Sequence, residues 1–449
     1  RLLIPFVGSG VEMIAIVVSA VLLPLAAGYH FGGKRYQRAV AKARAKGELP
    51  TASVRKMLIH NVLNSQICLT LGLSYLLLLL LFNLMSASGI THVLLQAALF
   101  CLIFLVYPVF LLAQTVPLVA NYFSNKVMSQ MTGQMLFFST MGSFMGSVLS
   151  TLLLMNWIGV HYTAVVVICM LFIALFLLSK SWAHAELWMG AVMVAFMVYL
   201  NTDEKLAMMN VVSNNAYNVV SVVDSQVVDG GRQININHSP SSLYTDQEVK
   251  RWGYVRFITN KILLPAKEPL DVLILGAGGF TIGFDEPRHS YTYVDIDPAL
   301  KEAAEEHMLP HKLAKNQTFV PVSARAFLNS HDKTYDVIIA DAYTNSLSIP
   351  SEMTTVEFWR QLDEHLRPRG ILVANMLVTA NYDTLYSVRA TNTFQSVFPH
   401  HLRQAVIEDF SMWEYFHNNI LYVHHKNAYG DDKGIYVDNL NTHSLDHHR

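Results

Sequence analysis

The residues best placed to do chemistry follow a short apolar run in the second half of the chain. The run Asp271–Leu275 leads directly into Gly276, Gly278 and Gly279. Glycine lets the backbone turn sharply and come close to a ligand, because it has no Cβ. Asp295 ends the next apolar run, nineteen residues after Gly276, where a carboxylate can accept hydrogen bonds from ribose hydroxyls. This pattern predicts a site for an adenosine-containing ligand, but it does not separate nicotinamide cofactors from S-adenosylmethionine.

A second acid lies at the end of a later apolar run. Tyr335–Ala340 is followed at once by Asp341, and then by Tyr343 and Thr344. Open α/β sheets bind their ligands at the carboxyl ends of the strands, so we expect Asp341 to lie near the glycine turn. A carboxylate in this place can take a proton as a general base. The alternative is that Asp341 only caps a helix after the strand.

Alternating strand and helix patterns predict the scaffold that positions these acids. Continuous apolar runs are typical of buried parallel strands, and they occur at residues 271–275, 291–294, 319–322, 335–340, 371–374 and 420–423. Helical patterns lie between several of them, most clearly over 356–366 and 382–397. The fold class predicted for residues 266–429 is therefore a doubly wound α/β domain.

Shorter elements precede this domain, and a polar tail follows it. Residues 217–224, 226–228 and 232–237 are predicted to be short strands around a turn, and 246–264 has a helical pattern. Residues 203–265 are thus expected to form a small β-rich lid with a linking helix. The segment 430–449 is polar and is expected to be a flexible tail.

The first half of the chain has the composition of a membrane protein. Charged residues make up 14% of the sequence, and none lies between Lys56 and Lys126 or between Lys126 and Lys180. This composition excludes disorder, a nucleic-acid-binding arm and a coiled coil. A hydrocarbon core about 30 Å thick needs roughly 20 apolar residues per helix. We therefore expect a transmembrane helical domain over 1–202, with about six spans near 11–31, 57–83, 91–113, 132–156, 160–179 and 184–200.

The loop over 34–56 contains eight cations and is expected to be cytoplasmic, because cytoplasmic loops are enriched in Lys and Arg. Six spans then place the second half of the chain outside. It stays in the cytoplasm if 184–200 does not cross the membrane.

The span centres contain no charge, which favours anchoring over ion-coupled transport. Gly142 and Gly146 have the Gly-x-x-x-Gly spacing, which lets the backbones of two helices approach closely, so we expect a tight helix pair there. The chain opens on Arg1 and is apolar from Leu2, so we expect the natural protein to have a further N-terminal segment.

The order of motifs in the second half resembles the spermidine synthase (polyamine aminopropyltransferase) family, a branch of the S-adenosylmethionine-dependent methyltransferase fold. The resemblance covers about residues 210–425. It rests on the glycine turn, the acid-tipped strands, Ile349-Pro350, Val356–Trp359 and Leu366–Val373. The first half resembles the membrane region that is fused to such domains in many bacteria. The resemblance implies a transferase in a bacterial inner membrane, and the supply of its co-substrate favours a cytoplasmic second half.

The resemblance also implies a nucleoside site. Its candidate cofactor-binding residues are Gly276, Gly278, Gly279, Asp295, Ser323 and Asn218. Asp295 matches the family's ribose-binding acid. Gly279 stands where the family has an Asp that contacts the amino end of decarboxylated S-adenosylmethionine. Ser323 stands where the family has an Asp that binds the adenine amino group, and Asn218 belongs to the lid.

The acceptor site matches the family less well. Asp341 matches the general base, but Thr344 replaces the family's second Asp, and Arg251–Gly253 replaces its Tyr-His-Glu gate. The candidate substrate-binding residues are Tyr343, Thr344, Glu248 and Tyr244. The nucleoside site is therefore expected to be better preserved than the amine site.

The reaction implied is transfer of an aminopropyl group from decarboxylated S-adenosylmethionine to a small amine such as a polyamine, with Asp341 as general base. Two other functions stay open: a methyltransferase, because intact S-adenosylmethionine fits better without an acid at Gly279, and a non-catalytic membrane protein that senses a nucleoside or polyamine or is coupled to transport. The expected partners are the lipid bilayer and the amine, with a homodimer as candidate assembly and no nucleic acid. No metal is expected, because the cysteines fall in the spans and the histidines lack metal-site spacing.

Overall fold

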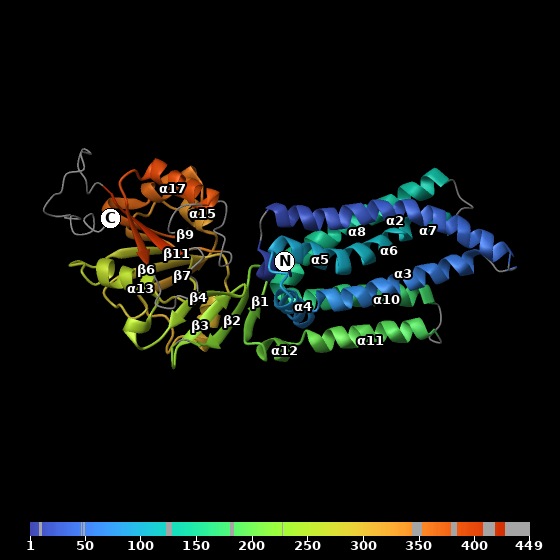
Figure 1. The fold of residues 1–449 in the computed structure, drawn as a ribbon, viewed down its shortest axis with the longest axis horizontal. Helices are drawn as coiled ribbons and strands as arrows, with labels where there is room; N and C mark the ends of the chain where they lie inside the picture. Colours follow the sequence, from blue (N-terminus) through green and yellow to red (C-terminus); the bar gives the residue numbers. More distant parts are fainter. Residues whose placement is uncertain are drawn as a thin grey trace. The chain divides into compact units, whose positions relative to one another are not determined.

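The computed structural model describes residues 1–8, 11–45, 47, 50–122, 128–179, 184–226, 228–343, 353–378, 384–406 and 418–426. The chain forms two compact units, Arg1–Asn218 and Val219–Arg449 (Figure 1). Each unit is described by itself. The expected tail over 430–449 and the Ile349-Pro350 motif lie outside the described residues.

The first unit is almost entirely helical (Figure 1). Its helices are α1 (Ile4–Val7), α2 (Val11–Ala45), α3 (Pro50–Leu73), α4 (Tyr75–Ala87), α5 (Val93–Cys101), α6 (Tyr107–Ala113), α7 (Thr115–Tyr122), α8 (Met128–Leu149), α9 (Met155–Trp157), α10 (Gly159–Ser179), α11 (Ala185–Leu200) and α12 (Asp203–Ala207). Two π-helical turns, η1 (Leu102–Val106) and η2 (Ser150–Leu154), continue α5 and α8, and the strand β1 (Val211–Asn214) follows α12.

Four of the helical stretches described are long and apolar enough to cross a membrane: Glu12–Ala45, Val93–Ala120, Gly133–Trp157 and Gly159–Ser179. A fifth is added if α3 and α4, which meet at a 69° bend, are one span. The helix Ala185–Leu200 is apolar but shorter. The expected count of six spans stays a prediction. The basic segment expected to be a loop is partly helical, because α2 runs on to Ala45.

Close helix packing occurs at a different glycine pair from the one expected. A Cβ added at Gly142 or Gly146 would meet no atom of the described chain within 4 Å, so the expectation of a helix pair there is wrong within this unit. At Gly28, an added Cβ would lie 2.7 Å from the main-chain oxygen of Phe110, and at Gly32 it would lie 2.6 Å from Pro117. The missing Cβ atoms therefore let α2 approach α6 and α7 closely.

The bend between α3 and α4 leaves a backbone donor without its helical partner. Ser74 separates the two helices with an extended backbone. The side-chain Oδ1 of Asn201, a residue with no exposed surface, accepts the hydrogen bond from the Tyr75 N–H at 3.2 Å. A buried N–H without a partner is costly in an apolar unit, so Asn201 stabilises the bend.

The second unit has a small antiparallel sheet followed by a large mixed sheet with helices (Figure 1). Its first elements are β2 (Val219–Asp224), β3 (Arg232–Ile236), β4 (Ser239–Tyr244), η3 (Glu248–Lys250), α13 (Gly253–Ile258) and η4 (Thr259–Leu263). The large sheet and its helices comprise β5 (Asp271–Leu275), β6 (Ser290–Asp295), α14 (Leu300–His307), β7 (Gln317–Pro321), α15 (Ala324–Asn329), β8 (Tyr335–Ala340), α16 (Val356–Glu364), β9 (Leu366–Val378), α17 (Leu385–Val397), β10 (Leu402–Val406) and β11 (Asn418–His425).

The large sheet has seven strands in the order β10-β11-β9-β8-β5-β6-β7. The strands β5 to β9 are parallel, and β11 and β10 add to β9 in antiparallel pairs. The expectation of an α/β sheet is confirmed, and the sheet is mixed rather than fully parallel. The strand expected over 226–228 is wrong, because Gln226 and Val228 lie in the loop between β2 and β3, where the Val228 N–H donates to Ser225 Oγ.

Apolar side chains bury both faces of the central strands. On one face Leu273, Ile338 and Leu372 pack in a core that also contains Phe358 of α16 and Phe394 of α17. The alternate residues on the same strands are buried as well, among them Val272, Ile274, Val337, Ile339 and Val373. Strands covered on both faces read as continuous apolar runs, which is why their positions could be predicted.

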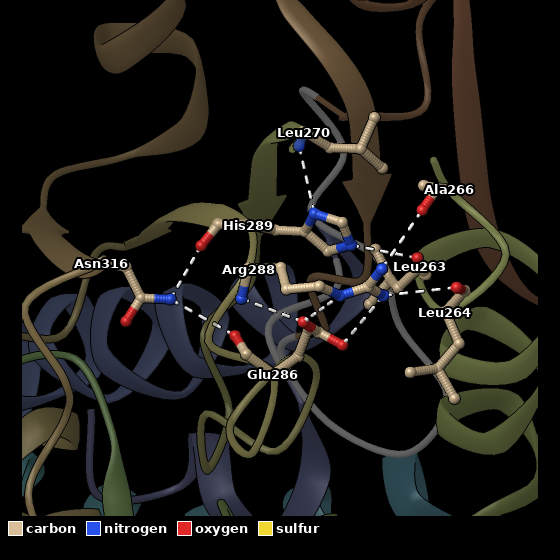
Figure 2. A network of polar contacts seen from close by, with 8 residues as sticks. All are labelled: Leu263, Leu264, Ala266, Leu270, Glu286, Arg288, His289 and Asn316. Atoms are coloured by element: carbon tan, nitrogen blue, oxygen red, sulfur yellow. Dashed lines mark hydrogen bonds and ion pairs between the residues drawn. The ribbon is translucent and has the colours of Figure 1, made fainter. Parts of the chain in front are cut away.

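A polar network around the buried His289 joins the segment before β5 to the loop before β6, as Figure 2 shows. His289, only 1% exposed, accepts a hydrogen bond from the Leu270 N–H at Nδ1 and donates from Nε2 to the Leu263 carbonyl. Arg288 binds the Glu286 carboxylate and the carbonyl of Ala266. These bonds fix the start of β5 and therefore the direction in which it delivers the glycine turn.

We expect His289→Ala to lower the free energy of unfolding of the second unit by about 2–4 kcal/mol, because it leaves the Leu270 N–H unpaired, removes one of the two hydrogen bonds to the Leu263 carbonyl and opens a cavity. Pulse proteolysis over a urea series would measure the change. His307→Ala, at an exposed position of α14, is the matched control and should change stability by less than about 0.5 kcal/mol. Equal effects of the two substitutions would contradict the role assigned to the network.

Candidate active site

The carboxyl ends of three neighbouring strands meet at the glycine turn. The Gly276 N–H donates to the Val294 carbonyl of β6 at 2.8 Å, and the Asp341 N–H donates to the Leu275 carbonyl of β5 at 2.8 Å. The Ala277 N–H donates to Oδ2 of Asp295 at 3.0 Å. The structure therefore brings the glycine turn, Asp295 and Asp341 together, as the sequence predicted.

Glycine is required at the first position of this turn. Gly276 has φ +97°, a conformation that residues with a Cβ rarely adopt. A Cβ at this position would also overlap with the main-chain carbonyl of Asp341. The end of β8 can therefore pass directly beside the turn only because residue 276 is glycine.

The next glycines face the lid strand β4. A Cβ at Gly278, where φ is +50°, would lie 2.7 Å from Ser242 Oγ. The Gly279 N–H donates to the same Ser242 Oγ at 2.9 Å, and a Cβ there would lie 2.7 Å from the Met308 sulfur. The strand β4 and the glycine turn thus pack closely at Gly279.

Phe280, directly after the glycine turn, has a left-handed backbone. Its φ is +60°, which costs free energy for a residue with a Cβ. The side chain has no exposed surface and packs edge-on against Tyr293 and Phe319. Burial of the ring offsets the backbone strain.

Asp295 is half-buried at the tip of β6 and is oriented by backbone donors. Its Oδ2 accepts from the Ala277 N–H, and its Oδ1 accepts from the Asp297 N–H at 3.1 Å. Burial raises the pKa of Asp295 to about 6, and these hydrogen bonds oppose the rise. Such an acid can accept hydrogen bonds from two neighbouring hydroxyl groups when it is ionised.

Asp341 follows β8 and is surrounded by polar groups from two other elements. The Asn375 Nδ2 donates to Asp341 Oδ1 at 2.9 Å, and the Tyr254 hydroxyl also hydrogen-bonds this carboxyl. Burial raises the pKa of Asp341 to about 7, although both hydrogen bonds lower it. A carboxyl with this pKa is suited to taking a proton near neutral pH.

Two of these side chains were not predicted from the sequence. Tyr254 comes directly after the Arg251–Gly253 stretch, and it is only 3% exposed. Asn375 comes directly after the apolar run at 371–374, so a polar residue that interrupts a buried strand was its signal. The signal of Tyr254 was weaker, because aromatic residues are common in cores.

The remaining candidates around the sheet are engaged in local structure. The Tyr343 hydroxyl donates to the main-chain carbonyl of Asn375. Ser323 is the N-cap of α15, and its Oγ accepts from the Ala326 N–H at 3.3 Å. Thr344 lies outside the described residues. The binding roles of Tyr343, Thr344 and Ser323 stay predictions.

The lid candidates lie in different surroundings. The Tyr244 hydroxyl donates to Asp246 at 3.0 Å, and burial raises the pKa of Tyr244 to about 12. Glu248 is exposed on η3. Asn218 ends the first unit, where its N–H donates to the Asn215 side chain. The roles of these residues also stay predictions.

No group of three or more His, Cys, Asp or Glu side chains within the described parts of the chain could hold a metal ion. The three cysteines, Cys68, Cys101 and Cys169, are free thiols of the helical unit.

The strand order, with β11 reversed against β9 and a glycine turn after the first parallel strand, defines a methyltransferase-like α/β fold. No model of a known protein family matches the chain. Sequence comparison confirms the resemblance to polyamine aminopropyltransferases. The chain is 34% identical over 134 residues to a probable polyamine aminopropyl transferase of Bifidobacterium longum, covering 28% of each chain.

Two further curated relatives carry the same kind of name. Identity is 28% over 171 residues to polyamine aminopropyltransferase 2 of Pseudomonas aeruginosa, covering 36% of this chain and 49% of the relative. It is 23% over 275 residues to the polyamine aminopropyltransferase of Oceanobacillus iheyensis, covering 55% and 52%. The chain thus matches between about a quarter and a half of these relatives' own lengths.

Solved structures similar to this chain include a probable spermidine synthase of Corynebacterium glutamicum, with TM-score 0.40 and 24% identity over 51% of this chain and 82% of that one. The spermidine synthase of Thermotoga maritima gives TM-score 0.38 and 16% identity over 48% of this chain and 73% of that one.

Gly276→Ala should abolish measurable binding of a nucleoside such as methylthioadenosine, because the added Cβ forces the end of β8 away from the turn. Gly230→Ala is the matched control: its φ is also positive, at +74°, but an added Cβ meets no described atom within 4 Å. The control should lose about 1–2 kcal/mol of stability from backbone strain and keep its nucleoside affinity. Calorimetry on the full chain in detergent measures the affinities. Parent-like affinity in Gly276→Ala would contradict the close approach.

Asp295→Ala should weaken nucleoside binding at least tenfold, since a hydrogen bond to a charged group contributes about 1.5–3 kcal/mol. In the parent, affinity should fall by up to about tenfold between pH 7.5 and 5, as Asp295 takes up a proton around its pKa of about 6. The variant should lack this pH-dependent step. Asp224→Ala, at the exposed end of β2, is the control. If the nucleoside affinity of the unsubstituted protein did not change with pH, the ribose-binding role of Asp295 would be refuted.

Proposed function

We propose that this protein is a membrane-anchored, spermidine synthase-like transferase that moves an aminopropyl group from decarboxylated S-adenosylmethionine to a small amine. One observation carries the proposal: the acids Asp295 and Asp341 lie at the ends of strands on either side of β5, next to its glycine turn. The sequence similarity to curated polyamine aminopropyltransferases supports it.

Asp295 binds the ribose hydroxyls, and the glycine turn gives the nucleoside room beside the backbone. Asp341 is the general base. At neutral pH the acceptor amine is an ammonium, which has no lone pair to attack with. Asp341 takes one proton, the free nitrogen lone pair attacks the propyl carbon next to the sulfonium, and the carbon–sulfur bond breaks with its electrons going to sulfur. The products are methylthioadenosine and a secondary ammonium.

The far end of the acceptor is bound by fewer acids than in the related family. Arg251, at the position of the family's gate, pairs with Asp285 and donates to the Thr245 carbonyl. The Asp285 carboxylate is already paired with Arg251, so this position offers no free carboxylate for a second ammonium group. We therefore expect weak binding of a diamine such as putrescine and better binding of an amine whose far end is not cationic.

A methyltransferase is the second candidate, and Gly279 is the observation that favours it. An acid at this position would repel the carboxylate of intact S-adenosylmethionine, whereas the Gly279 N–H and Ser242 Oγ are neutral. Product analysis separates the two reactions: methylthioadenosine identifies aminopropyl transfer, and S-adenosylhomocysteine identifies methylation. Nucleoside binding with neither product would identify a sensor.

The apolar helices of the first unit support anchoring in a bilayer. We propose a bacterial inner membrane, with the α/β unit on the cytoplasmic side where the nucleoside co-substrate is made. The charge-free centres of the spans support anchoring rather than conduction. A homodimer is the proposed assembly, and we propose no nucleic-acid partner and no metal.

Asp341→Asn should lower methylthioadenosine formation by roughly a hundredfold or more, because loss of a positioned base costs about 10²–10⁴-fold. The amide keeps the size of the side chain and can still hydrogen-bond, so the variant should fold and bind the nucleoside as the parent does. In the parent, kcat/KM should fall about tenfold per pH unit below 7, where Asp341 of the unliganded protein is protonated.

Asp336→Asn is the control, because Asp336 lies on the same strand β8 and pairs with Arg367. It should lower stability and leave the pH profile unchanged. Near-normal turnover by Asp341→Asn would remove Asp341 from the chemistry and favour the methyltransferase or the sensor.

A further inference from the structure

The side chain of Asn375 is buried beside the proposed base with one half of its amide unused. The residue is only 4% exposed, and its Nδ2 donates to Asp341 Oδ1 at 2.9 Å. Its Oδ1 is buried and has no hydrogen-bond partner among the residues that the structure describes. The amide therefore presents an acceptor at the same place where Asp341 presents a carboxylate.

Neighbouring contacts prevent Asn375 from turning away. Ala374 pairs with Ala340 in the parallel register of β9 and β8, so Asn375 and Asp341 are the next residues on adjacent strands. The Tyr343 hydroxyl bonds to the main-chain carbonyl of Asn375. Rotation of the amide by 180° would place Oδ1 against the carboxylate, which also only accepts hydrogen bonds when ionised. The donor side is thus fixed toward Asp341.

An unpaired buried carbonyl oxygen is costly, because folding removes its hydrogen bonds to water. A ligand N–H that donates to Asn375 Oδ1 would remove this cost. The same ligand nitrogen can also reach Asp341, because the Nδ2 end of the Asn375 amide already hydrogen-bonds to the Asp341 carboxyl. An amine nitrogen with two N–H groups or more satisfies both acceptors at once.

We propose that Asn375 positions the acceptor nitrogen and selects for amines that carry at least two N–H groups when protonated: its Oδ1 accepts one N–H while Asp341 takes the proton from another. This inference rests on the proposed function and deepens it, because it names the acceptor class. The hydrogen bond to Asn375 Oδ1 keeps the nitrogen in place after Asp341 has taken the proton.

Atoms and charges balance in this arrangement. A primary ammonium brings three protons: one goes to Asp341, one donates to Asn375 Oδ1, and one stays on the nitrogen. After the carbon–nitrogen bond forms and the carbon–sulfur bond breaks, the nitrogen keeps two protons as a secondary ammonium. Sulfur gains the electron pair and becomes a neutral thioether. A tertiary ammonium carries only one proton and cannot satisfy both acceptors.

Binding can be measured without turnover. The full chain in detergent is saturated with methylthioadenosine, and calorimetry compares butylamine with N,N-dimethylbutylamine. The parent should bind the primary amine about tenfold more tightly, and Asn375→Ala should reduce this preference to less than about threefold, which corresponds to the loss of one hydrogen bond. Methylthioadenosine affinity should not change. Asn329→Ala, at an exposed position of α15, is the control and should keep the preference.

A kinetic readout distinguishes positioning from a structural role. The Asn375 hydrogen bond lowers the pKa of Asp341, so its removal should shift the acidic limb of the rate profile to higher pH while KM for the amine rises. An unshifted limb together with an unchanged amine preference would overturn the inference, as would a parent that binds neither amine. A parent that prefers the primary amine but forms no methylthioadenosine would refute the proposed function and leave the amine site standing.

Discussion

The site depends on the absence of one Cβ atom, at Gly276. The end of β8 passes so close to the turn after β5 that only glycine fits there. This approach lets the Asp341 N–H bond to Leu275, which in turn sets where the Asp341 carboxyl emerges. Because Gly276 also bonds to Val294 of β6, the same turn fixes the distance between the two acids.

The support for this turn extends in both directions along the sheet. Before the turn in the chain, the network of His289 and Arg288 holds the segment that leads into β5 (Figure 2). Beside it, Ser242 of β4 accepts the Gly279 N–H and so ties the small sheet to the turn. The strained backbone at Phe280 is tolerated because its ring is fully buried. The geometry of the turn thus rests on packing, on hydrogen bonds to backbone groups and, behind the start of β5, on the Arg288–Glu286 ion pair.

Much of the large sheet could be predicted because its central strands are apolar on both faces. The strands that escaped prediction lack this signal. β4 has the sequence Ser-Pro-Ser-Ser-Leu-Tyr and forms because β3 pairs with it. β10 has the sequence Leu-Arg-Gln-Ala-Val, without a continuous apolar run, and pairs with β11. Backbone pairing with a neighbour, which no local pattern reports, decides such strands.

The same contrast holds for the site. Asp295 and Asp341 could be placed because each ends an apolar run next to a glycine turn or a strand end. Asn375 and Tyr254 could not be connected to Asp341, since the contacts cross 34 and 87 positions of the sequence. The failure at Gly142 and Gly146 has a similar cause: the spacing permits close helix packing, but only the tertiary arrangement decides which glycine pair is used.

The raised pKa values of the two acids fit a cationic co-substrate. Burial raises the pKa of Asp295 to about 6 and that of Asp341 to about 7, so in the unliganded protein the carboxyls resist ionisation. A sulfonium or ammonium bound nearby favours the ionised form and lowers both values. Under the proposed function, Asp341 becomes a carboxylate when the cation is present, and Asn375 and Tyr254 then hold it by charge-assisted hydrogen bonds. Binding of the co-substrate would thus prepare the base that the reaction needs.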